Sequence, residues 1–254
     1  MIPEAVRALE RDLRGIFGSR LQSLAIYGAR AAAPDAHHAH DAHAHAHGSA
    51  TPTRTLAVVE SMTRDDLRAA ATRVDAWHDA GLATPLLLGA REFSQSLDAF
   101  PLEFGAILAD HVVVAGENPF AALAVDPTDV RRAVEVQARS HLLHLREGFL
   151  ETRGRADALS LLILQSAPAF AALVTSIARL EGKGDGDPLS GARHVERLVG
   201  QSAPAGAAEH GAISDVVKLA TAHDLASAAA EQLFAPYLDA VERIVAYVDG
   251  WSGR

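Results

Sequence analysis

The chain has 254 residues, of which 49% are hydrophobic and 22% charged, and its formal net charge is −9. This size and composition allow a substantial buried core in one large or two smaller domains. The acidic balance and the aromatic content of only 5% argue against a general nucleic-acid binder, which needs a basic surface and stacking side chains. The sequence contains no cysteine, which excludes disulfides and thiolate metal sites.

The apolar segments are short. None reaches the roughly 18 uninterrupted apolar residues of a membrane span, and the N-terminal residues do not read as a secretion signal. We therefore expect a cytoplasmic protein that does not enter a membrane.

Helices and strands alternate over the first 120 residues. An amphipathic helix is predicted over residues 3–17, with Val6, Leu9 and Leu13 at helical spacing. Short apolar runs predict strands over residues 21–28, 55–60, 86–89 and 111–116. Between them, one helix is predicted from the N-cap Thr63 to about Gly81, and a short one over residues 91–98. This order predicts an α/β (α+β) fold, with a mixed sheet and flanking helices.

Strand signals stop at Asp126, which is predicted to cap a helix whose first residue is Pro127. A second helix is predicted over residues 156–180, where Pro168 should kink or split it, and the last over residues 225–248. We therefore predict an α/β domain over residues 1–125 and an all-α helical bundle over residues 126–254.

A histidine-rich loop over residues 31–54 interrupts the first two predicted strands. Its six closely spaced imidazoles are His37, His38, His40, His43, His45 and His47. Imidazole nitrogens bind zinc and nickel, so this loop is a candidate metal site. The alanine spacers supply no fixed geometry, and a tolerated low-complexity expansion is the alternative.

Four phrases carry a resemblance to a known family: LAIYGAR, SLDAFPLEFGAIL, HVVVAGENPF and LFAPYLDAVERIVAYVD. They resemble bacterial proteins that join a polymerase-β-like nucleotidyltransferase domain to a C-terminal helical bundle. The resemblance implies a Gly-Ser turn that holds the triphosphate, and an Asp-x-Asp pair that binds magnesium on the next strand. The turn positions here are Gly28, Ala29 and Arg30, and the acidic positions are Thr53 and Thr55.

Two threonines cannot replace two carboxylates as magnesium ligands, and the segments LLLG and HVVVAG contain no third acid. We therefore expect a protein that has lost nucleotidyl transfer and binds a small molecule, a nucleotide or a protein partner. An active magnesium-dependent enzyme that uses displaced acids, Asp35, Asp41 or Glu103, is one alternative. A zinc- or nickel-binding protein is the other.

Two further features of the sequence have both a functional and a structural interpretation. Glu103 lies among apolar residues in FPLEF, where burial or an arginine partner would perturb it, although a structural acid has the same pattern. Arg139 and His144 have the R-x4-H spacing that resembles the ribonuclease motif of HEPN helical domains. Ordinary bundle side chains explain that spacing equally well.

Overall fold

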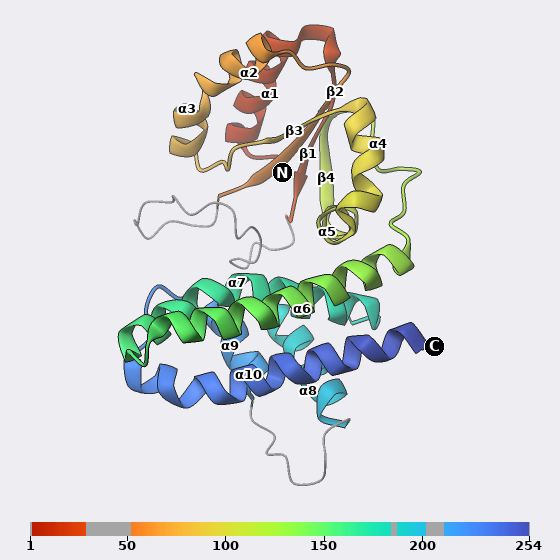
Figure 1. The fold of residues 1–254 in the computed structure, drawn as a ribbon. Helices are drawn as coiled ribbons and strands as arrows, with labels where there is room; N and C mark the ends of the chain where they lie inside the picture. The colour runs from red at the N-terminus through yellow and green to blue at the C-terminus, as the bar shows by residue number, and fades with distance from the viewer. Residues whose placement is uncertain (1, 29–51, 184–186, 202–210, 254) are drawn as a thin grey trace. The chain divides into compact units, whose positions relative to one another are not determined.

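The computed structural model describes residues 2–28, 52–183, 187–201 and 211–253. The described chain forms two compact units that divide between Asp126 and Pro127. The first unit mixes strands and helices, and the second is helical (Figure 1). The predicted fold class, a mixed sheet with flanking helices followed by helices alone, is confirmed.

A four-stranded sheet forms the centre of the first unit. Its strands are β1 (Leu21–Tyr27), β2 (Arg54–Val59), β3 (Leu86–Gly89) and β4 (His111–Gly116). Their order in the sheet is β3-β2-β1-β4, with β2 and β3 parallel and the other two pairs antiparallel. The second strand begins at Arg54, one residue before the predicted start, so the predicted loop over 31–54 extends too far at its C-terminal end.

The helices of the first unit differ from the prediction in two places. They are α1 (Glu4–Phe17), α2 (Arg64–Ala71), α3 (Val74–Asp79), α4 (Ala90–Ala99) and α5 (Pro101–Ala109). One expected helix is divided into α2 and α3, because the Thr72 hydroxyl donates to the Ala69 carbonyl and Arg73 N–H bonds three residues back. Helix α5 was not predicted.

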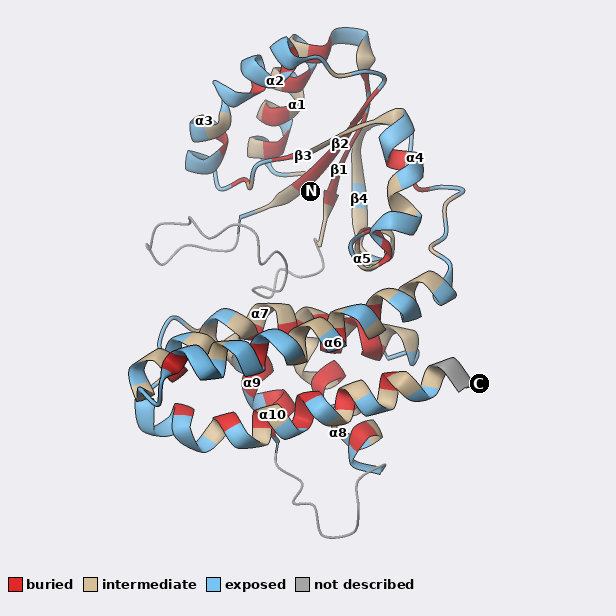
Figure 2. Cartoon of the chain, in the orientation of Figure 1, coloured by how far each residue is buried: buried red, intermediate tan, exposed pale blue. Residues whose placement is uncertain are grey.

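Alternate residues of the strands enter two separate apolar layers. One layer joins Ala57 and Val59 of β2 to α1, α2 and α3, and includes Trp77. The other joins Leu56 and Val58 to α4 and α5. Both faces of the central strands are therefore buried, and β1 and β2 lie almost entirely in the interior (Figure 2).

Gly116 allows the edge strand β4 to approach β1. Its φ is +77°, and a Cβ atom there would overlap the Gln22 carbonyl oxygen. The ladder between the two strands also shifts register between Leu24 and Ala25. After this irregularity, His111 at the start of β4 pairs with Tyr27 at the end of β1.

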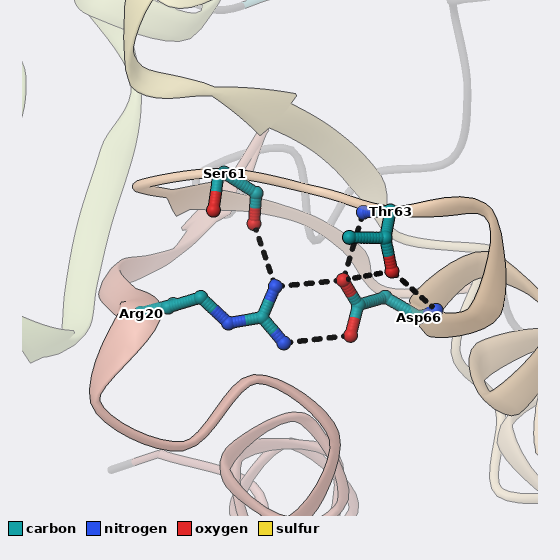
Figure 3. A network of polar contacts seen from close by, with 4 residues as sticks. All are labelled: Arg20, Ser61, Thr63 and Asp66. Carbon is teal, nitrogen blue, oxygen red and sulfur yellow. Dashed lines mark hydrogen bonds and ion pairs between the residues drawn. The ribbon is translucent and has the colours of Figure 1, made fainter.

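A network of polar contacts fixes the start of α2 (Figure 3). Thr63 is the N-cap, as predicted: its hydroxyl accepts from Asp66 N–H, while the Asp66 carboxylate accepts from Thr63 N–H. Arg20 donates to both Asp66 carboxylate oxygens over 2.7 Å and to the Ser61 carbonyl over 3.1 Å. The bidentate pair thus connects the start of β1 with the start of α2.

The second unit packs around α7. Its helices are α6 (Pro127–Thr152), α7 (Ala156–Leu180), α8 (Pro188–Gln201), α9 (Ala212–Leu219) and α10 (Ser227–Asp249), followed by a 3-10 turn over Gly250–Gly253. Helix α7 contacts the other four helices, which explains its apolar composition. It is not split at Pro168.

Helix α7 is long and apolar enough, by length and composition alone, to cross a membrane, although no apolar segment of that length was predicted. Half of its most apolar window is buried inside the unit. A core helix of a folded domain passes the same test, and the contacts with four neighbouring helices account for this one.

Three helices of the second unit meet at a buried polar contact. The Tyr237 hydroxyl of α10 lies 2.7 Å from His141 Nε2 of α6 and 3.1 Å from Ser166 Oγ of α7. Burial, and to a smaller extent the charge of His144, lowers the pKa of His141 to about 4. Burial also raises the pKa of Tyr237 well above its usual range, although the Ser166 hydrogen bond opposes this. His141 is therefore neutral in the folded bundle near pH 7.

Candidate functional site

The end of β1 and the start of β2 lie next to each other at one end of the sheet. Gly28 follows β1 with φ +67°, and its N–H donates to the Asp110 carbonyl over 2.9 Å. Tyr27 pairs with Arg54 of β2 on one side and with His111 of β4 on the other. The two faces of this end carry different side chains, because consecutive residues of a strand point to opposite faces.

Thr53 and Thr55 belong to the face that packs on α1, α2 and α3, since they alternate with Ala57 and Val59. Thr55 pairs with Ile26 and has an exposed fraction of 0%, and its hydroxyl has no hydrogen-bond partner among the described residues. Thr53 is half-buried, and its backbone forms a bridge with Leu82.

The neighbouring strand adds no acid to this face. Leu87 of β3 pairs with Ala57 and packs into the same apolar layer. Strands β1 to β4 contain neither aspartate nor glutamate. Within the described ranges, no group of three histidine, cysteine, aspartate or glutamate side chains could hold a metal ion.

The opposite face carries a row of three polar side chains, Arg54, Tyr27 and His111, on adjacent strands. The Arg54 guanidinium lies over the Tyr27 ring, with its Cζ 5.5 Å from the ring centroid. A Cβ atom on Gly28 would lie 3.2 Å from Arg54 Nη2, so the glycine lies against this cation. The His111 ring packs against Phe120, and its Nδ1 lies 3.1 Å from the Ile107 carbonyl oxygen.

Glu103 occupies the position of a structural acid, one of its two predicted interpretations. It is exposed, in the first turn of α5, where a carboxylate favours the positive end of the helix dipole. This position favours the structural interpretation of Glu103 over a buried acid, because Pro101, Phe104 and Ile107 turn the apolar side of the helix inward.

Several predicted site residues lie outside the described residues. These are Ala29 and Arg30 of the turn, the displaced acids Asp35 and Asp41, and all six loop histidines, His37, His38, His40, His43, His45 and His47. Zinc or nickel binding by the loop stays a prediction.

Arg139 and His144 are not brought together as a pair. Arg139 forms ion pairs with Glu135 and Asp249, at 3.4 Å and 2.6 Å. The His144 side chain is 76% exposed and lies 3.4 Å from Glu147. Both behave as surface residues of α6, which favours the structural interpretation of the R-x4-H spacing.

Sequence reasoning missed the row of Arg54, Tyr27 and His111. Arg54 lies between the two threonines, and strand alternation alone predicts that it faces away from them. The position of His111 could not be predicted, because its pairing with Tyr27 depends on the register of β4.

No family model matches this sequence, and no curated protein matches it either. By structure, the chain is similar to spectinomycin adenyltransferase AAD(9) from Enterococcus faecialis, solved with ATP and spectinomycin. The TM-score is 0.53 and the sequence identity 11%, over 97% of this chain and 98% of that chain. The fold is therefore nucleotidyltransferase-like along its length.

Proposed function

We propose that this protein uses a nucleotidyltransferase-like fold to bind a ligand or partner and does not transfer nucleotides. The observation that carries the proposal is the composition of one sheet face, where Thr53, Thr55 and Leu87 stand on adjacent strands. Two-metal phosphoryl transfer needs anionic oxygen ligands to hold magnesium and to neutralise developing charge. Two hydroxyls and a leucine supply none.

The packing of Thr55 supports the same conclusion. Its side chain is fully buried beside Ile26, and its hydroxyl is unpartnered among the described residues. An ionised carboxylate in this position would be desolvated, at a cost of several kcal/mol without a metal or other partner, on the order expected for a buried charge. This position is part of the apolar core.

A transfer assay tests the proposal. The purified chain is incubated with magnesium and ATP labelled at the α-phosphate, with spectinomycin and related aminoglycosides as acceptors, and AAD(9) serves as the positive control. We expect no labelled acceptor above the background without protein.

Magnesium-dependent transfer by this chain would overturn the proposal. The variant Glu103→Gln then identifies the source of the activity. Loss of transfer in this variant would establish the displaced-acid enzyme, whereas retention would assign the chemistry to other acids.

A further inference from the structure

Arg54 carries a positive charge that the described residues do not neutralise. It forms none of the ion pairs found among them, and its Nη1 atom is buried without a hydrogen-bond partner there. A partly desolvated guanidinium without an acceptor is costly, because a buried polar group loses its hydrogen bonds to water. A bound anion would supply the acceptor that this guanidinium lacks among the described residues.

The surroundings of Arg54 hold it in place. The Tyr27 ring lies under the guanidinium, and Gly28, which lacks a side chain, leaves room beside Nη2. The cation–π contact with Tyr27, and the pairing of Arg54 with Tyr27 across the two strands, restrict where the guanidinium can point. Its donors are therefore preorganised, which reduces the entropy lost on binding.

His111 supplies a second nitrogen to the same row. Its Nδ1 lies 3.1 Å and 3.2 Å from the carbonyl oxygens of Ile107 and Leu108, so Nδ1 carries a proton that points into the fold. Nε2 is the ring atom left to contact a ligand, and in this tautomer it accepts a hydrogen bond from a protonated phosphate oxygen. The Tyr27 side chain stands between the two nitrogen groups on the central strand.

We propose that Arg54, Tyr27 and His111 form a metal-independent site for the phosphate group of a ligand. The guanidinium fork and the imidazole come from different strands, an arrangement that suits a tetrahedral oxyanion with several acceptor oxygens. The site lies on the sheet face opposite Thr53 and Thr55, so it does not use the positions at which magnesium would bind. This inference rests on the proposed function, since it names the ligand class of the binding protein.

Binding is measured by calorimetry on the full-length protein, at pH 7 with EDTA and constant chloride. The probes are inorganic phosphate, pyrophosphate and AMP, which distinguish free phosphate from a phosphate ester on a nucleoside. We expect saturable binding of at least one probe without a metal. Arg54→Gln should weaken it by about tenfold or more, the loss expected for charge-assisted hydrogen bonds.

Two further variants distinguish the bidentate hydrogen bonds of the Arg54 guanidinium from the effect of positive charge alone. Arg54→Lys keeps the charge but loses the bidentate fork, so it should bind more weakly than the wild type and more tightly than Arg54→Gln. Arg68→Gln is the matched control, because Arg68 is exposed on α2 and is already paired with Asp65. It should bind like the wild type, and circular dichroism verifies that each variant is folded.

Three results would each overturn the proposed site. They are no saturable binding of any probe, binding that requires magnesium, and equal binding by the wild type and Arg54→Gln. Equal loss in Arg68→Gln would also overturn it, because the effect would then follow net charge alone. These outcomes are independent of the transfer assay. If the protein transfers nucleotides and does not bind phosphate at Arg54, both proposals are refuted. If it neither transfers nucleotides nor binds phosphate there, only the proposed site is refuted.

Discussion

At the scale of single residues, neighbours in β2 have opposite environments. Thr55 is fully buried on the sheet face that packs on α1. Arg54 points to the other face, and its buried Nη1 atom has no hydrogen-bond partner among the described residues. The two-residue period of a strand produces this difference directly. Hydroxyl side chains on one face and a cation on the other therefore come from one tripeptide, residues 53–55.

The charge of Asp66 supports the stability of the first unit. Hydrogen bonds from Arg20, and then from the backbone and hydroxyl of Thr63, hold the pKa of its carboxyl well below the usual range. A carboxyl with a depressed folded-state pKa stabilises the fold above its unfolded value of about 3.9. This contribution is lost as the pH falls through the lower folded-state value.

We therefore expect Asp66→Asn to lower the thermal midpoint at pH 7 by about 5 °C or more, since it breaks a bidentate pair and a capping box. The difference from the wild type should stay constant between pH 5 and pH 8 and shrink below about pH 4. Scanning calorimetry across this range measures it.

Asp65→Asn is the control for this prediction. Its side chain is 86% exposed and pairs with Arg68, and exposed pairs contribute little. If the two substitutions lowered the thermal midpoint equally, negative charge in the first turn of α2 would be responsible, and not the pair of Arg20 and Asp66.

At the scale of elements, the strands could be predicted because each is a short apolar run bounded by glycine, proline or polar residues. The start of α2 could also be predicted, since Thr63 and Asp66 form a local capping signal. Helix α5 was missed because its apolar residues have little one-sided periodicity in the sequence. The row of Arg54, Tyr27 and His111 was missed because strand order and register are long-range properties.

Contacts between helices explain the titration of His141. Its Nε2 lies 2.7 Å from the Tyr237 hydroxyl, at the meeting point of α6, α7 and α10. Burial lowers its pKa to about 4, so the folded bundle binds a proton less readily than the unfolded chain. The stability from the neutral ring is complete above the unfolded pKa of about 6.5 and is lost as the pH falls to about 4.

We expect the protonation of His141 alone to lower the free energy of unfolding by about 3 kcal/mol as the pH falls from 7 to 4. His141→Gln should lack that component, so its unfolding free energy should depend less on pH over this window. Urea unfolding at several pH values measures the difference. His144→Gln changes an exposed neighbour on the same helix and should follow the wild-type curve. The prediction would be contradicted if the unfolding free energies of His141→Gln and the wild type differed by the same amount at every pH.

At the scale of the whole molecule, each unit has an interior of its own. The first has two apolar layers on either side of its sheet. The second encloses α7, whose buried residues include Ile163, Phe170 and Ile177, among four other helices. A unit with its own core has the physical requirements for independent folding.

We therefore expect a fragment of residues 127–254 to fold without the first unit. It should give a helical far-ultraviolet spectrum and a single cooperative urea transition, with a slope of about 1–3 kcal/mol per molar, typical of a small domain. Val136, Leu143 and Leu150 are exposed on α6 at seven-residue intervals, so the measurement is repeated over a range of protein concentrations to detect association. A fragment of residues 1–126 provides the comparison. A gradual, non-cooperative transition of the bundle fragment would show that its core needs the first unit, and the two units would then form one folding domain.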